Sequence, residues 1–267
     1  MKFIHFTDPH LVTPGEKLHG IDPLQRMQEC LAHIATNQKD AEFCVITGDL
    51  ADRGEPEAYQ ALHDELAKFP LKTYLILGNH DHRENFFTAF PNKTRDEIGF
   101  VQSCLQHEFG DFLFLDTLDQ GQRTGLYCGH RQAWLSNCLS ETKDRDVYLF
   151  LHHPPFPIGI PPLDDIALSN PREFAEVLRT HDRIKYLFFG HVHRPVNGSW
   201  HGVPFSTLFG TNHQVALSFE SDEVISYSLE PPAYNIVLLE QDRTVIHTCN
   251  YQDESAWRPD RRPTVAS

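Results

Sequence analysis

Five stretches of the chain carry almost unbroken runs of apolar residues, rich in Val, Ile, Tyr and Phe. Strands that are buried on both faces of a sheet have this pattern, whereas half-exposed strands alternate apolar and polar residues. The runs predict buried strands over residues 2–7, 41–49, 71–81, 146–153 and 184–191, and shorter apolar segments predict further strands over 109–117 and 203–209.

Apolar residues at helical spacing lie between these runs. Asp22 followed by Pro23, and Asn170 followed by Pro171, are typical of a helix N-cap and first helical position. A third helix is expected after residues 54–58, and a fourth over 130–139. The apolar stripes of the first three helices are Leu24, Met27, Leu31 and Ile34; Tyr59, Leu62, Leu66 and Phe69; and Phe174, Val177 and Leu178. Strands that alternate with helices predict a layered α/β fold.

Two regions depart from this alternation. Residues 152–165 are rich in proline, so we expect a loop without regular structure, of the kind that often forms the wall of a site. After about residue 210 the helices stop, and residues 235–240 and 244–249 predict a pair of strands. We therefore expect a main domain over 1–215 and a smaller unit over 216–267, which ends in a loose tail and forms a cap or a contact in a homodimer.

Composition narrows the classes of function. Asp and Glu number 37 against 23 Lys and Arg, for a formal net charge of −14. A chain this acidic is a poor candidate for binding a DNA or RNA backbone. The 17 histidines are unusual, and neutral imidazole is the commonest metal ligand.

The compartment is also constrained. The N-terminal MKFIHFTDPH is too short and too polar for a signal peptide, and no apolar run is long enough to cross a membrane. The six cysteines show no Cys-x-x-Cys spacing. A reduced cytoplasmic protein that does not bind membranes is the expectation, with a stray disulfide left open.

Residues that can bind metal follow the end of each of the five buried runs. Ligands of α/β sheets bind at the carboxyl ends of the strands, so these residues should meet in one place. They are Asp8 and His10; Asp49; Asn79, His80 and Asp81; His152 and His153; and His191 and His193.

The ligand types indicate which metals fit. Carboxylate, carboxamide and imidazole without thiolate favour Mn, Fe, Co or Zn. The ligands are too many for a four-coordinate structural zinc site. Two ions that share a carboxylate use the set better, and ion pairs roughly 3.5–4 Å apart suit displacement at phosphorus.

In this order, the motifs DxH, GDxxD, GNHD, HH and GHxH resemble those of the calcineurin-like metallophosphoesterase superfamily, and they span residues 8–193. The segments GEKLHG, LHHPPFP and TNHQV are similar to one branch, the class III cyclic nucleotide phosphodiesterases and their glycerophosphodiesterase relatives. The resemblance implies a four-layer α/β/β/α sandwich with a dinuclear metal centre.

The resemblance also implies a role for each matching residue. A hydroxide held by the ions would attack phosphorus, and His80 would protonate the leaving oxygen or donate a hydrogen bond to it. Asp81 would orient His80, and Asp52 would have a structural role or contact the ligands from outside. Asp8, His10, Asp49 and His193 would hold the first ion, and Asn79, His152 and His191 the second, with Asp49 shared.

Single motifs have simpler explanations. GNHD alone fits an Asn-rich turn, and His191 with His193 fits a half-buried pair. For these explanations to hold, all five motifs would have to occur at strand ends by chance, and we reject that interpretation. At the fourth strand end His152 follows the strand directly and is preferred to His153 as the ligand. His5 is expected in the core or beside the ligands.

The expected activity is hydrolysis of a small-molecule phosphodiester, with 3′,5′ or 2′,3′ cyclic nucleotides favoured. A glycerophosphodiesterase or broad diesterase is the alternative. A non-catalytic metal-binding scaffold and a DNA nuclease are weaker rivals. Substrate selection is assigned to groups around the metals: Lys17, His19, His213 and Gln214 as polar contacts, with Phe156, Ile158 and Ile160 as an apolar wall.

Overall fold

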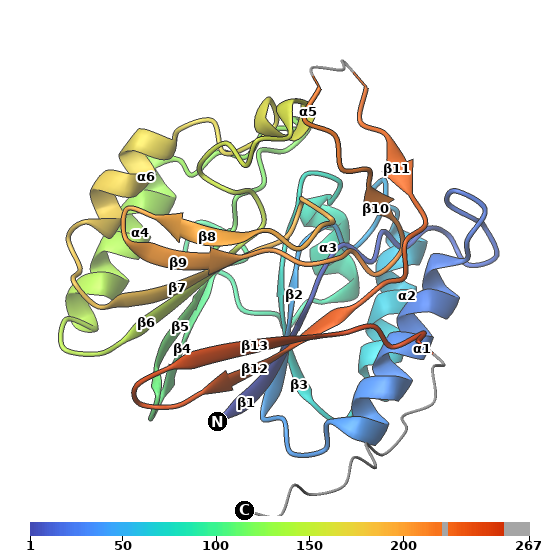
Figure 1. Cartoon of the computed structure of the whole chain (residues 1–267), viewed down its shortest axis with the longest axis horizontal. Helices are drawn as coiled ribbons and strands as arrows, with labels where there is room; N and C mark the ends of the chain where they lie inside the picture. The colour runs from blue at the N-terminus through green and yellow to red at the C-terminus, as the bar shows by residue number, and fades with distance from the viewer. Residues whose placement is uncertain (221–223, 254–267) are drawn as a thin grey trace, which may run out of the picture.

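The computed structural model describes residues 1–220 and 224–253, and its core is two facing β-sheets. The first sheet has the strand order β13-β12-β1-β2-β3, and the second has the order β4-β5-β6-β7-β9-β8. A short third sheet pairs β10 with β11. Helices cover the outer side of each large sheet, with α4 and α6 at the left and α1 and α2 at the right of Figure 1.

The first sheet contains β1, the first strand in the sequence, and β12 and β13, the last two strands of the described residues. β1, β2 and β3 run parallel, while β12 pairs antiparallel with β1 and β13 pairs antiparallel with β12. Their bounds are β1 Lys2–Phe6, β2 Phe43–Thr47, β3 Lys72–Ile76, β12 Tyr234–Leu239 and β13 Thr244–Cys249.

The second sheet is built from the middle of the chain. β5, β6, β7 and β9 run parallel, and the hairpin partners β4 and β8 form its antiparallel edges. The bounds are β4 Ser103–His107, β5 Gly110–Phe114, β6 Val147–Leu151, β7 Ile184–Phe189, β8 Asn197–Trp200 and β9 Val203–Ser206; the third sheet has β10 Gln214–Val215 and β11 Tyr227–Ser228.

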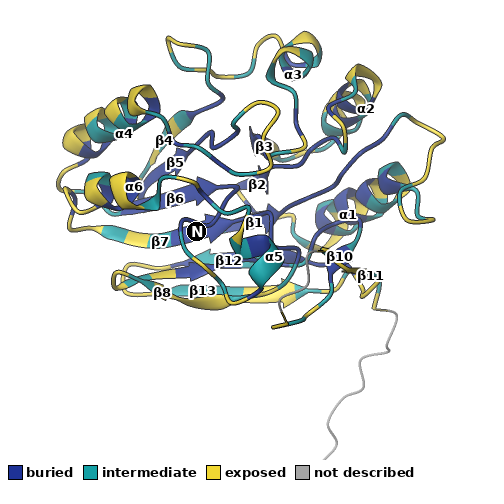
Figure 2. Cartoon of the chain, turned by 90° about the horizontal axis from the view of Figure 1, so that it is seen from above, coloured by how far each residue is buried: buried dark blue, intermediate teal, exposed yellow. Residues whose placement is uncertain are grey.

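Three apolar layers hold the sandwich together. Between the sheets, aromatic side chains interlock, with the Phe3 ring stacked on Phe43 and in edge contact with Phe150. Outside the first sheet lie α1 Pro23–Asn37, α2 Pro56–Leu66 and α3 Arg83–Ala89; outside the second lie α4 Gly129–Glu141 and α6 Pro171–Leu178. The helix faces that meet the sheets are buried (Figure 2). The four-layer α/β/β/α sandwich is confirmed.

Most of the expected elements are present, with small changes of bounds. The structure adds β4, β8, β10, β11 and the helix α3, which the sequence pattern did not predict. The expectation of no regular structure over residues 152–165 was wrong in one respect, because α5 (Pro161–Asp164) forms there. Two prolines at its start fix the backbone angle of the first turn. The Asp164 carboxylate accepts from the main-chain N–H groups of Ile158 and Gly159, so it stabilises this loop.

The C-terminal strand pair exists as expected, but it extends the main sheet. β12 pairs with β1 from Lys2↔Leu238 to His5↔Asn235, and Val237 and Leu239 are buried between the sheets. β10 and β11 pair antiparallel, with Val215 opposite Tyr227, so this pair includes residues from both sides of the expected boundary. Strand β12 therefore packs in the core between the two sheets, while the division of the chain at 215/216 and the cap or homodimer contact stay predictions. The loose tail lies largely outside the described residues.

The cysteines and the helices can be compared with what the sequence predicts. All six cysteines are free thiols. Among the described residues, no helix is both long and apolar enough to cross a membrane.

Candidate metal centre

The loops that follow β1, β2 and β7 hold their side chains in an unusual backbone conformation. Positive φ angles are uncommon for residues other than glycine and cost roughly 1–3 kcal/mol each. Five of the seven predicted ligands have them: Asp8 (53°), His10 (44°), Asp49 (48°), His191 (67°) and His193 (50°). Strain concentrated in one set of residues indicates that the surrounding fold holds these side chains in place for a function.

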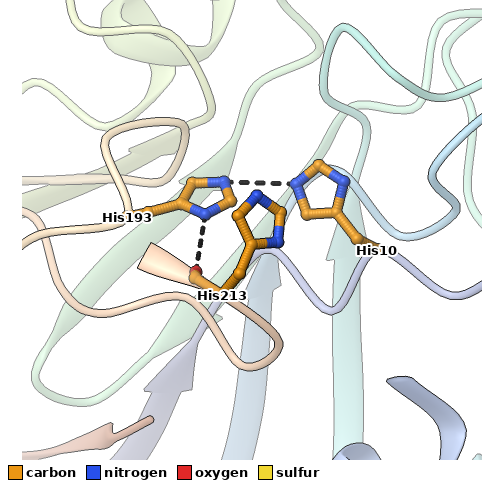
Figure 3. Close-up of side chains that lie close together, drawn as sticks. All are labelled: His10, His193 and His213. Carbon is orange, nitrogen blue, oxygen red and sulfur yellow. Dashed lines mark hydrogen bonds between the residues drawn. The ribbon is translucent and has the colours of Figure 1, made fainter. Parts of the chain in front are cut away.

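The first group of candidate ligands brings carboxylates and imidazoles together after the ends of β1, β2 and β7. His193 Nε2 is 3.2 Å from Asp8 Oδ1 and 3.2 Å from His10 Nε2, and Figure 3 shows the two rings facing each other. His10 Nε2 is 3.5 Å from Asp49 Oδ2. The four side chains are buried and their ligand atoms lie within 4.8 Å of one another.

The second group lies on the other side of Asp49. His152 Nε2 is 3.4 Å from Asp49 Oδ2 and 3.2 Å from Asn79 Oδ1. The His152 and His191 rings are 5.0 Å apart, and His191 Nε2 is buried without a hydrogen-bond partner among the described residues. One oxygen, Asp49 Oδ2, therefore lies within 3.5 Å of an imidazole from each group.

Three histidines are oriented by hydrogen bonds from their Nδ1 atoms. His10 donates to Asp52 Oδ1 at 3.1 Å, His152 to the Thr47 carbonyl at 2.7 Å, and His193 to the His213 carbonyl at 2.9 Å. A proton fixed on Nδ1 leaves the Nε2 lone pair free for a cation. Asp52 thus contacts a candidate ligand, and its supporting role stays a prediction.

The donor set fits divalent metal ions. The converging Nε2 lone pairs need a shared cation, and the buried His191 Nε2 has no hydrogen-bond partner within the described part of the chain. Burial opposes a charge on His152, yet the carboxylates of Asp49 and Asp8 raise its pKa to about 9. Burial likewise opposes ionisation of Asp49, but the imidazoles, His152 first, hold its pKa well below the usual range. The field of the site thus favours positive charge where the ligands meet.

Glycines before the ligands allow the loops to approach closely. A Cβ at Gly78 would lie 2.2 Å from Asp49 Oδ1, and one at Gly190 would lie 2.3 Å from the Thr47 carbonyl. The backbone must pass at these two points for Asn79 and His191 to face Asp49. The glycines of GNHD and GHxH therefore serve packing at the site.

His80 lies at the mouth of the centre. Its Nδ1 donates to the Asp52 carbonyl at 2.6 Å, and its side chain is 41% exposed. Burial lowers the pKa of His80, but the charge of Asp49 and the contacts with Asp52 outweigh it and raise the pKa overall. The ring lies 4.7 Å from that of His10. This position suits a group that meets substrate without being a ligand.

Asp81 does not orient His80 as expected. Its buried carboxylate accepts from the N–H groups of Leu50, Ala51 and Gly78 and from the Tyr59 hydroxyl. Asp81 therefore ties the loop after β2 to the loop after β3, and its expected role is corrected to supporting the backbone of both. The error arose because the GNHD motif places Asp81 next to His80 in sequence but turns its side chain the other way.

We expect Asp81→Asn to destabilise the fold, because an amide presents an N–H group to donors that need an acceptor. A buried donor left unsatisfied costs about 1–3 kcal/mol, whereas Tyr59→Phe, which removes one of the four donors, should cost about 1 kcal/mol. Urea unfolding of both variants, with the exposed Asp64→Asn as the control, measures this. Equal stability of Asp81→Asn and the control would contradict the role.

The two predicted substrate contacts have different positions. His213 faces the centre, with its ring 5.0 Å from that of His10 and 4.7 Å from that of His193 (Figure 3). Gln214 is fully buried, and its amide bonds the N–H and the carbonyl of Gly210 at 2.8 Å. Gln214 therefore closes the turn that presents His213, and the expectation of a substrate contact is corrected.

A cavity of about 170 Å³ opens over the centre. His19 lines it as expected, but the apolar wall differs from the expected one: Phe156 packs in the core against Phe189 and Phe205. Arg123 was missed, since it belongs to no motif. The cavity is lined by His10, His19, Asp49, Asp52, Asn79, His80, Arg123, Leu163, Ile166, His191, His193, His213, Val215 and Ile225.

Two further histidines are buried beside the candidate ligands. His153 Nδ1 is hydrogen-bonded with the Thr117 hydroxyl at 2.8 Å, and its ring lies 4.8 Å from that of His191. His5 Nε2 is hydrogen-bonded with the Thr47 hydroxyl, and burial lowers the pKa of His5 to about 3. Of the adjacent pair at the end of β6, His152 is thus the one beside Asp49 and Asn79.

Comparison with known proteins gives consistent results. Residues 1–195 match the calcineurin-like phosphoesterase family. The chain is 42% identical over 254 residues to a probable cyclic nucleotide phosphodiesterase of Rhodopseudomonas palustris. The matched region covers 94% of this chain and 93% of the relative. It is 29% identical to a probable glycerophosphodiester phosphodiesterase of Arcobacter nitrofigilis, over 88% of each chain. Its fold is similar to that of a dimetal phosphatase from Danio rerio, with a TM-score of 0.72, 16% identity, and coverage of 94% of this chain and 96% of the other.

Proposed function

The chain belongs to the calcineurin-like phosphoesterase family, and from this we propose that it hydrolyses cyclic nucleotides at a pair of divalent metal ions. The position of Asp49 carries the proposal. Its Oδ2 lies within 3.5 Å of His10 Nε2 and of His152 Nε2, which belong to different ligand groups. A shared carboxylate between two groups of nitrogen ligands is what a dinuclear centre requires.

The protein groups have distinct tasks in this reaction. Two bound ions would lower the pKa of water and neutralise charge at phosphorus. We assign to His80 the donation of a proton or hydrogen bond to the leaving oxygen, from the Nε2 that its Asp52 contact leaves free. Arg123 reaches the same cavity and adds a positive charge near the phosphate. Mn, Fe, Co or Zn suit the mixed oxygen and nitrogen ligands.

The cavity wall favours a nucleotide over a bare glycerol group. Leu163, Ile166, Val215 and Ile225 give an apolar side to a cavity whose floor is polar. At the rim the His19 and Tyr227 rings stack, with centroids 3.8 Å apart, and Tyr227 is 52% exposed. Flat exposed rings can pack against a base, whereas glycerol offers no comparable surface.

The test of this proposal is turnover of a substrate panel by the purified chain loaded with Mn²⁺. It should hydrolyse at least one of the 3′,5′ and 2′,3′ cyclic nucleotides. Glycerophosphodiester hydrolysis without cyclic nucleotide hydrolysis would move the assignment to the alternative diesterase. Cleavage of single-stranded DNA at low salt would instead favour a nuclease, against the net charge of −14.

We expect His213→Ala to raise KM by about 3–10-fold, the value of one lost hydrogen bond, and to leave kcat nearly unchanged. The His193 Nδ1 bond goes to the main-chain carbonyl of residue 213, which alanine keeps. Steady-state kinetics on the preferred cyclic nucleotide separate the two constants. A fall in kcat at unchanged KM would assign His213 to the chemical step.

A further inference from the structure

A second cavity lies away from the candidate metal centre. It has a volume of about 610 Å³ and lies between the end of α2, the start of β3 and the segment that follows α3. It shares no lining residue with the catalytic cavity. Lys72 begins β3, and the metal ligand Asn79 follows that strand's far end. Figure 2 shows α2 and α3 side by side beyond β3.

The charges around this cavity are unlike those of the chain as a whole. The chain carries 37 acidic and 23 basic residues, yet no Asp or Glu lines the cavity, while His63, Lys72 and Lys93 do. Neither lysine has an ion-pair partner within residues 1–220 and 224–253; Lys72 Nζ lies over the Tyr74 ring at 4.9 Å. Two unpaired ammonium groups at one concave site attract a dianion.

Lys93 is the most constrained of these groups. It is partly buried, and among the described residues its ammonium donates one hydrogen bond, to the Thr73 carbonyl at 2.7 Å. Burial, followed by the charge of Lys72, lowers the pKa of Lys93 to about 8. Partly buried charge without a counter-ion is costly, so an anion between the two lysines would stabilise this arrangement.

The remainder of the wall is apolar. Leu66, Phe69 and Phe90 contribute to it, and Lys93 Nζ lies 6.0 Å from the centre of the Phe90 ring. The volume falls in the range of small-molecule sites, about 300–1,000 Å³. An inorganic ion would leave most of this space empty.

We propose that this cavity is a second ligand site, which binds a phosphomonoester-type dianion carried on an apolar, ring-sized body. The two ammonium groups hold the dianion and the side chains of Leu66, Phe69 and Phe90 contact the body. The site is separate from catalysis and does not depend on the substrate assignment above.

The test uses phenylphosphonate, which has the dianion and a ring but no ester bond. Titration calorimetry of the full, metal-loaded chain compares it with Lys93→Met and Lys72→Met, which keep side-chain length without charge. Lys68→Met is the matched control, because Lys68 is exposed, pairs with Glu65 at 3.0 Å and does not line the cavity. Turnover of bis(p-nitrophenyl) phosphate should be unchanged in all three variants, which confirms that they fold.

Lys93→Met and Lys72→Met should each weaken one phenylphosphonate binding event by roughly tenfold or more, the value of a charge-assisted hydrogen bond, while Lys68→Met matches the unmodified chain. Equal binding by the unmodified chain and Lys93→Met, including no binding by either, would overturn the site. Equal affinity at this site for inorganic phosphate would contradict the proposal that the ligand carries an apolar body. Equal affinity for benzoate would contradict the preference for a dianion.

Discussion

Replacing Asp49 by alanine is expected to empty both metal positions and to lower activity by roughly 10³-fold or more, since loss of a single electrostatic group at a transition state already costs about 10²–10³. The reason is its position, with Oδ2 within 3.5 Å of both His10 and His152. His193→Ala should mainly empty the first position, because His193 contacts Asp8 and His10 but no member of the second group at hydrogen-bond distance.

Metal analysis of the purified variants measures this directly. Because Asp49 has a φ of 48°, alanine adds backbone strain, so Asp49→Asn is the better-tolerated companion. Circular dichroism of both variants controls for folding. Two ions still bound to a folded Asp49→Ala variant would rule out a shared carboxylate.

His80→Ala is expected to retain normal metal content and to lose roughly 10²–10⁴ in rate on substrates with alkyl leaving groups, the usual contribution of a positioned acid or base. Among the described residues, the His80 ring is hydrogen-bonded to the Asp52 carbonyl alone. The His80 main-chain N–H, which alanine keeps, donates to Asp49 Oδ1. The loss should shrink for bis(p-nitrophenyl) phosphate, whose leaving group needs little protonation.

The pH profile gives a second readout for His80. Asp49 and Asp52 raise the pKa of His80 against the opposing effect of burial, which extends its protonated range to higher pH. Activity on alkyl leaving groups should fall as pH rises through that pKa, and His80→Ala should lack this limb. Equal losses for p-nitrophenyl and alkyl leaving groups would remove His80 from the leaving-group role.

The parts of the fold predicted from sequence are those with strong local signals. Strands such as 147–151 are buried on both faces, so nearly every residue is apolar. Helix α1 begins with the Asp22 cap and a proline. Helix α6 also begins with a proline, but the Asn170 side chain accepts from the Tyr127 N–H instead of capping the helix. Helix α3 was missed because it has only seven residues and its N-cap is His82, an uncommon capping residue. The place of β12 beside β1 was missed because it depends on pairing between residues more than 200 positions apart.

The same distinction holds at the site. The candidate ligands could be located because each follows a strand, and the parallel strands of a sheet bring their carboxyl ends to one edge. The structure adds that β1, β2 and β3 belong to the first sheet and β6 and β7 to the second, so the site lies between two such edges. The roles of Asp81 and Gln214 depend on which main-chain groups face their side chains. The adjacent residues in the sequence do not reveal this. Arg123 and the apolar wall come from loops whose positions are set only by the complete fold.

Diffraction from Mn²⁺-soaked crystals at the manganese absorption edge would show whether two ions share Asp49. We expect two anomalous peaks per chain, roughly 3.5–4 Å apart. One should lie near Asp8, His10 and His193 and the other near Asn79, His152 and His191, with Asp49 Oδ2 between them. A single peak at full occupancy, or two peaks that do not share Asp49, would contradict this expectation.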